Sequence, residues 1–283
     1  MKIHSLNTGL FKLDGGAMFG VVPKVLWSKH IQADEHNLCN WTTRLLLIES
    51  GKRLILIDTG LGNKQDDKFF KHYYLSNTKT LKLALSEIGF GLDQITDVIL
   101  THLHFDHCGG AVSKNNNLLE PTFKNATFWS SKQHWEWATN PNSREKASFL
   151  TENILPLQES GQLKFIDRSS TLISSSPIKN IDFIFVDGHT DAMMLPLISI
   201  KEKKILYTAD LLPSTIHLPI PWVMGYDTKP LQTVKEKKII LEQAYKNNWL
   251  LFFEHDSHNE ACTLKQTEKG IRVDEITSLK EYL

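Results

Sequence analysis

The sequence predicts an α/β fold, and three observations support this prediction. The chain has 283 residues, which is enough for one large α/β domain, or two small ones, with a substantial buried core. Short apolar runs that are typical of strands recur along it, and several of them end in a residue that can bind metal. Segments with helical spacing lie between these runs, near residue 80 and around residues 130–160.

The first half is predicted to hold strands and one helix. Residues 44–49 and 53–58 are apolar runs joined by Ser50, Gly51 and Lys52, a pattern that is typical of a hairpin. Residues 80–88 have a helical pattern. Residues 97–101 form a short apolar strand that leads directly into His102.

The middle of the chain is predicted to be an elaboration on the core. Residues 127–129 are a strand candidate, and Ser130 or Ser131 is placed to cap a helix that contains Trp135 and Trp137. Residues 143–158 are predicted to form another helix. Because short helices need a surface to bury against, we expect a helical insertion around residues 130–160 within a single domain of residues 1–283.

The second half shows one pattern three times. Apolar runs at residues 182–186, 204–208 and 249–253 are each followed by a residue that can bind metal: His189, Asp210 and His255. Strand ends at one edge of a sheet converge, so residues far apart in the sequence can share a site. These three residues are therefore candidates for one site.

The strongest local signal is the segment THLHFDHCGG at residues 101–110. It places His102, His104, Asp106 and His107 within six residues. Imidazole and carboxylate are ligands for zinc and for harder first-row metals, and the absence of a thiolate set argues against a closed structural zinc site. A lone histidine is usually a surface or core residue, whereas four residues of metal-ligand type in one loop indicate a metal site.

The H-x-H-x-D-H motif, with the later His, Asp and His, resembles the metallo-β-lactamase-fold hydrolase superfamily from residue 44 to His255. The resemblance implies an α/β four-layer αβ/βα sandwich with two mixed sheets and the site along the edge where they meet. It implies that His102, His104 and His189 hold one metal. Asp106, His107 and His255 would hold a second metal, and Asp210 would bridge both. Asp58 would support the site without touching metal.

By the same resemblance, two divalent metal ions would activate a water for attack on a carbonyl or phosphoryl centre. Zinc is the expected metal, and iron, manganese and cobalt also suit these ligands. Asp106 and Asp210 are then catalytic through the metals that they hold. The expected activity is that of a dinuclear metallohydrolase on a lactone, ester or phosphotriester.

The loop and the region before the core look like the branch that holds N-acyl homoserine lactone lactonases and methyl parathion hydrolases. This likeness places Phe105 beside the substrate, although plain packing is an equal reading. Residues 14–23 read as a turn and a strand, or as a pocket mouth that includes Met18 and Phe19. Some lactonases carry a tyrosine where this chain has Pro213, and Tyr226 is a candidate to replace it. The family sequence His-Thr-Pro-Gly-His is also altered at residues 189–193.

Two other functions stay open at this point. A glyoxalase II-like thioesterase would share the metal motif, but only 28 residues (283 − 255) follow the last metal histidine, which leaves little room for a glutathione-binding region. A non-catalytic metal-binding scaffold is the other alternative, and the complete ligand set argues against it. A nuclease is disfavoured by the charge balance, and a flavodiiron protein by His104 and by the chain length.

Composition limits the partners. Lys+Arg and Asp+Glu both number 32, so the net charge is zero, whereas nucleic-acid binders usually carry a basic excess. No apolar run approaches the roughly 20 residues that span a bilayer. The three cysteines are widely spaced and odd in number, which does not suggest a disulfide framework. We expect a cytoplasmic protein with a small-molecule substrate and no nucleic acid or membrane partner; a homodimer is left open.

Overall fold

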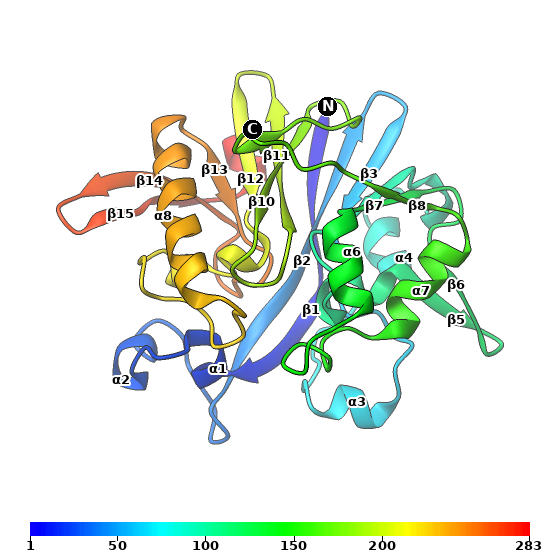
Figure 1. Ribbon diagram of the computed structural model, residues 1–283, viewed down its shortest axis with the longest axis horizontal. Helices are drawn as coiled ribbons and strands as arrows, with labels where there is room; N and C mark the ends of the chain where they lie inside the picture. The colour runs from blue at the N-terminus through cyan, green and yellow to red at the C-terminus, as the bar shows by residue number, and fades with distance from the viewer. The chain divides into compact units, whose positions relative to one another are not determined.

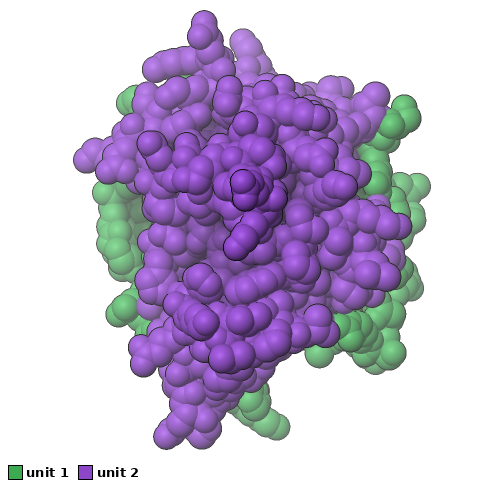
Figure 2. Space-filling view, turned by 90° about the vertical axis from the view of Figure 1, so that its left-hand side faces the viewer, with its two compact units in different colours: residues 1–9, 43–170, 192–194 green, residues 10–42, 171–191, 195–283 purple.

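The computed structural model describes all residues, 1–283 (Figure 1). Contacts between the residues divide the chain into two compact units (Figure 2). Unit 1 holds residues 1–9, 43–170 and 192–194, and unit 2 holds residues 10–42, 171–191 and 195–283. The expectation of a single domain over residues 1–283 stays a prediction. None of the helices is both long and apolar enough to cross a membrane.

A six-stranded mixed sheet has the order β1-β2-β3-β4-β7-β8, and most of its residues belong to unit 1. The strands are β1 (Lys2–Asp14), β2 (Leu38–Ser50), β3 (Arg53–Ile57), β4 (Asp97–Ile99), β7 (Thr127–Ser130) and β8 (Leu163–Phe165). β2 and β3 form the predicted antiparallel hairpin. The pairs β3–β4, β4–β7 and β7–β8 are parallel. A separate hairpin joins β5 (Val112–Asn115) to β6 (Leu118–Pro121).

Unit 1 contains five helices. They are α3 (Asp67–Lys71), α4 (Leu81–Ser86), α5 (Phe105–Cys108), α6 (Lys132–Thr139) and α7 (Thr151–Glu159), with short 3-10 turns η1 (Leu92–Gln94) and η2 (Gly109–Ala111). All of these helices except α3 contribute residues to a core formed with this sheet. Trp135 of α6 and Leu157 of α7 belong to the same buried cluster as Val98 and Phe128 of the sheet. The insertion therefore buries one face of its helices on the core of unit 1, as an amphipathic helix must.

Two predicted helices of unit 1 begin later than the sequence indicated. Thr80 is the cap of α4 and not its first residue, because its hydroxyl accepts a hydrogen bond from the Leu83 amide at 3.2 Å. Residues 143–148 form turns, so α7 starts at Thr151 and the predicted start at residue 143 was wrong. The Asn142 side chain accepts bonds from the amides of Arg144 and Glu145, a local arrangement that competes with the helix.

Unit 2 is built on a seven-stranded mixed sheet with the order β15-β14-β13-β12-β11-β10-β9. The strands are β9 (Ile173–Ser174), β10 (Ile181–Val186), β11 (Met193–Ile200), β12 (Lys203–Tyr207), β13 (Leu250–Phe252), β14 (Ala261–Thr267) and β15 (Gly270–Thr277). β12 and β13 are parallel, and β13, β14 and β15 are antiparallel in turn. The longest helix, α8 (Pro230–Lys246), packs on β14 and β15. The predicted α/β class with two mixed sheets is confirmed.

The remaining elements of unit 2 are short: α1 (Gly15–Phe19), α2 (Lys24–Trp27), η3 (Ala209–Leu211), η4 (Thr215–His217) and α9 (Leu279–Tyr282). The predicted turn and strand at residues 14–23 is therefore wrong, because α1 and a turn occupy this segment. The Asp14 carboxylate caps α1 by accepting the Ala17 amide at 2.8 Å. A Cβ on Gly15 would lie 2.4 Å from the Trp27 ring, so the glycine permits this close packing.

The three cysteines are free and buried, and none lies in a disulfide. Burial raises the pKa of the Cys39 thiol to about 11. The same cause raises the pKa of the Cys108 and Cys262 thiols to about 12. Cys108 belongs to unit 1, whereas Cys39 and Cys262 belong to unit 2.

Candidate metal centre

The metal-ligand motif of unit 1 lies in the loop that follows β4 and in the first turn of α5. Its three imidazoles and its carboxylate are buried. The ring centroid of His102 lies 3.9 Å from that of His107 and 4.6 Å from that of His104. The short spacing of the H-x-H-x-D-H motif thus brings three buried imidazole rings close together. The assignment of His102 and His104 to one metal and of His107 to the other stays a prediction.

Asp58 fixes two of these histidines. Its Oδ1 accepts the Thr101 amide at 2.8 Å, and its Oδ2 accepts the Thr101 hydroxyl at 2.7 Å and faces the His107 Nδ1 at 3.1 Å. The Thr101 hydroxyl in turn lies 3.1 Å from the Nδ1 of His102. The hydrogen-bond network assigns the proton of each imidazole to Nδ1, so Nε2 is the nitrogen suited to a metal.

His104 is oriented through its other ring nitrogen, Nε2. Its Nε2 lies 3.4 Å from a carboxylate oxygen of Glu145, which leaves Nδ1 as the ligand atom. Glu145 accepts bonds from Trp137 Nε1 at 2.7 Å and from Asn142 Nδ2 at 2.6 Å, so its position is fixed. Glu145 was not predicted as a site residue, because no local spacing connects it to a histidine 41 residues away.

The two glycines that end the motif permit a close backbone contact. A Cβ on Gly109 would lie 2.1 Å from the Leu61 carbonyl oxygen, and a Cβ on Gly110 would lie 2.3 Å from the Thr59 carbonyl oxygen. Lys64 donates a hydrogen bond to the Gly109 carbonyl. Burial lowers the pKa of Lys64 to about 8. The motif loop is therefore pressed against residues 59–64, which only glycine allows.

Unit 2 brings its three predicted ligands together. Asp210 lies between two histidines, with one carboxylate oxygen 3.2 Å from the Nε2 of His189 and the other 3.2 Å from the Nε2 of His255. All three side chains are buried. Asp210 therefore contacts the two histidines through different carboxylate oxygens.

The histidines of unit 2 are also oriented through Nδ1. Asp227 Oδ1 lies 3.0 Å from the Nδ1 of His189, and the Thr42 carbonyl oxygen lies 2.7 Å from the Nδ1 of His255. Glu236 of α8 accepts the amides of Asp187 and Gly188 and so fixes the loop that leads to His189. Sequence reasoning gave no role to these residues, since nothing in their spacing connects them with the ligands.

The chemistry of both clusters fits divalent metal. Each holds buried imidazoles together with a carboxylate, which is the ligand set of catalytic zinc and related first-row ions. Each imidazole is oriented by a hydrogen bond from its other ring nitrogen, as in metal sites of known proteins.

Comparison with known proteins decides the family. The model of the metallo-β-lactamase superfamily matches residues 43–255. The chain belongs to the metallo-β-lactamase superfamily. Its fold is the metallo-β-lactamase fold, as the sequence resemblance predicted.

Three relatives show how far this likeness extends. A probable metallo-hydrolase of Methanocaldococcus jannaschii is 34% identical over 102 residues, which is 34% of this chain and 45% of that protein. A probable metal-dependent hydrolase from Staphylococcus aureus is 28% identical, with a TM-score of 0.86 over 98% of both chains. The dizinc quorum-quenching lactonase AidC is 25% identical, with a TM-score of 0.78 over 98% of this chain and 95% of that one.

The predicted substrate residue Phe105 packs in an aromatic group of unit 1. Its ring lies 5.3 Å from Phe69 and 4.8 Å from Tyr73. Burial, and to a smaller extent the charge of Asp106, raise the pKa of the Tyr73 hydroxyl to about 12, so it keeps its proton at neutral pH. Sequence reasoning did not single out Tyr73. Contact of Phe105 with substrate stays a prediction.

The other substrate candidates lie in unit 2. Met18 and Phe19 are fully buried, and Phe19 stacks on Trp27 and on His217 with ring centroids 5.1 and 4.8 Å away. This packing is the role that the structure gives to Phe19. Tyr226 is 40% exposed. A substrate contact of these three side chains stays a prediction.

Proposed function

We propose that this protein is a metal-dependent hydrolase that binds two divalent ions and acts on a small lactone, ester or phosphotriester. The observation that carries the proposal is the position of Asp210, whose two oxygens each face an imidazole nitrogen at 3.2 Å. A carboxylate held in this way can serve two metals at once. Superfamily membership and the paired His/Asp clusters support the same reading.

The proposed ligand sets are those that the family resemblance implies. His102, His104 and His189 would hold one metal. Asp106, His107 and His255 would hold the other, and Asp210 would bridge the two. Zinc is the first candidate, and iron, manganese or cobalt suit the same donors. When bound, such ions supply an activated water and polarise the carbonyl or phosphoryl oxygen of the substrate.

The side chains of this protein then have defined roles. Asp58 and Asp227 accept the Nδ1 protons of His107 and His189, which keeps the Nε2 lone pairs available for metal. Phe105 and Tyr73 form an apolar wall beside the motif loop of unit 1. Such a wall excludes water and suits an uncharged substrate better than a polyanion.

A lactone is the substrate that we favour, because the superfamily relative AidC is described as a lactonase. In this chain Pro213 stands where some lactonases carry a tyrosine, and its carbonyl oxygen accepts the His255 amide at 3.2 Å. Proline has no hydroxyl to assist the substrate carbonyl. We propose that Tyr226 supplies this hydroxyl.

The test begins with elemental analysis of protein purified without chelator or added metal. The same sample is then assayed on an acyl homoserine lactone, an aryl ester, a phosphotriester and a glutathione thioester. About two metals per chain and chelator-sensitive turnover of the first three classes are expected. Preference for the thioester would replace the proposal with a glyoxalase II-like activity. Metal binding without any turnover would favour a scaffold.

A further inference from the structure

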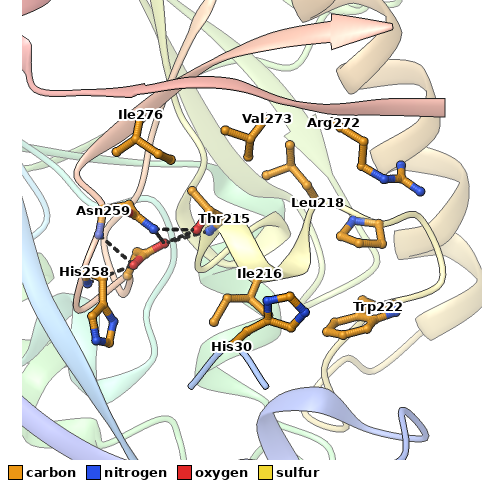
Figure 3. Close-up of a pocket in the computed structure, with 12 residues that line it drawn as sticks. His30, Thr215, Ile216, Leu218, Trp222, His258, Asn259, Arg272, Val273 and Ile276 are labelled. Carbon is orange, nitrogen blue, oxygen red and sulfur yellow. Dashed lines mark hydrogen bonds between the residues drawn. The ribbon is translucent and has the colours of Figure 1, made fainter. Parts of the chain in front are cut away.

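Unit 2 contains a pocket that no part of the proposed metal centre uses. It encloses about 440 Å³, and all of its lining residues belong to unit 2 (Figure 3). This volume is in the range of small-molecule sites. A ligand in this pocket would be separate from the substrate of the proposed hydrolase activity.

Most of the wall is apolar. Ile216 and Leu218 come from η4 and the residue that follows it, and Trp222 comes from the next loop. Val273 and Ile276 of β15 form the opposite part of the lining, as Figure 3 shows. The ring of Trp222 is supported by His30, whose imidazole lies 5.8 Å away in an edge contact. These side chains form an apolar surface that can bind the hydrocarbon part of a ligand.

One loop of the wall is fixed by a buried lysine. Lys237 of α8 is fully buried, and its ammonium group donates to the carbonyl oxygens of His217, Pro219 and Trp222 at 2.6, 3.0 and 2.7 Å. Three acceptors of one cation hold this loop in a single arrangement. The pocket wall is therefore formed before any ligand binds, which reduces the ordering cost of binding.

A buried aspartate fixes the second loop. Asp256 accepts the amides of Thr215, His258 and Asn259 at 2.9, 2.9 and 2.8 Å, and the Thr215 hydroxyl at 2.6 Å. The carboxylate of Asp256 is thus satisfied by donors of the protein itself. Its role is to fix the loop that shapes this side of the pocket.

The cation of the pocket is Arg272 on β15. Its Nη1 donates to the Ile271 carbonyl oxygen at 2.7 Å, and the guanidinium group forms no salt bridge. Its cross-strand neighbour Lys265 pairs with Asp274 at 3.3 Å. A guanidinium group carries five N–H donors in a planar arrangement that matches a carboxylate, so Arg272 has donors left for an anionic ligand.

From these walls and this cation we propose that the pocket binds an amphipathic carboxylate, with the apolar chain against Ile216, Trp222 and Val273 and the carboxylate on Arg272. Isothermal titration calorimetry with sodium octanoate tests the assignment, and 1-octanol serves as the uncharged analogue. The wild-type protein is expected to bind octanoate at one site per chain. Arg272→Gln should weaken octanoate binding about tenfold or more, because charge-assisted hydrogen bonds are lost, and should leave octanol binding unchanged.

Two further variants control the experiment. Lys269→Gln removes one positive charge from the exposed turn of the same hairpin and should bind octanoate like the wild type. Ile216→Trp fills the pocket and should abolish binding of both ligands, with the fold verified by circular dichroism. The proposal is overturned if wild type binds no octanoate, if Arg272→Gln and Lys269→Gln weaken it equally, or if folded Ile216→Trp binds as before.

Discussion

The Nε2 atom of His104 lies 3.4 Å from a carboxylate oxygen of Glu145, and both side chains are buried. Glu145 comes from the insertion and His104 from the metal-ligand motif. The insertion therefore contributes to the orientation of a motif histidine and does not only cover the core of unit 1.

Glu145→Gln should lower metal affinity. The amide cannot accept the imidazole proton and both neighbouring donors, so His104 loses its fixed orientation, and losses of about 10–100-fold are typical of such supporting groups. Competition with a metal-binding dye measures the affinity. The matched control is Glu136→Gln on α6, whose carboxylate is largely exposed. Equal affinities in the two variants would show that Glu145 does not position His104.

Asp210→Ala should abolish most turnover while the fold is retained. Removing the carboxylate takes away the side chain that faces both His189 and His255 through its two oxygens. Turnover on the substrate identified by the panel and the far-UV circular dichroism spectrum are compared with those of Asp167→Ala, which removes an exposed carboxylate. Near-normal turnover in a folded Asp210→Ala protein contradicts the bridging role.

His217 should make the protein sensitive to acid. Burial lowers the pKa of His217 to about 4 from an ordinary value of 6.5. The unfolded chain therefore binds a proton before the folded protein does. The stabilisation is complete above pH 6.5 and is lost as the pH falls through 4, with about 3 kcal/mol at stake.

The measurement is the difference in unfolding free energy between wild type and His217→Gln from pH 7 to pH 4. Subtraction removes the contributions of the other titrating groups that both proteins share. The advantage of the wild type should shrink as the pH falls. A difference that stays constant over this range would mean that His217 is not held neutral.

Gly109→Ala should destabilise unit 1. The new Cβ would lie 2.1 Å from the Leu61 carbonyl oxygen, and a backbone atom cannot move aside as a side chain can. Overpacking of this kind costs about 1–3 kcal/mol. Thermal unfolding of the variant is compared with that of Gly91→Ala, where the nearest atom is the end of the Gln94 side chain at 3.7 Å. A midpoint equal to that of Gly91→Ala would show that the loop can relax.

The sequence predicted the sheets better than the helix starts. The strands at residues 53–58 and 182–186 were evident because apolar runs with turn residues at their ends have few other readings. The starts of α4 and α7 were misplaced because Thr80 and Asn142 bind backbone amides with their side chains. The helix α1 was missed because its glycine-rich sequence gives no helical signal.

The candidate ligands were predictable for a different reason. His102, His104 and His107 are close in the sequence, and the family pattern adds the later residues. The supporting groups follow no local pattern: Glu145 approaches His104 through folding of the insertion, and Asp227 reaches His189 from a loop 38 residues later. Such partners become visible only when the chain is folded.

The buried cysteines give each unit its own chemical reporter. A thiol with a pKa near 12 carries almost no thiolate at neutral pH, and the thiolate is the form that reacts. Alkylating agents should therefore modify these side chains only during opening events. Modification of Cys108 records opening of unit 1, whereas modification of Cys39 or Cys262 records opening of unit 2. Peptide mass spectrometry of a timed labelling reaction would then show whether the two units open together or one before the other.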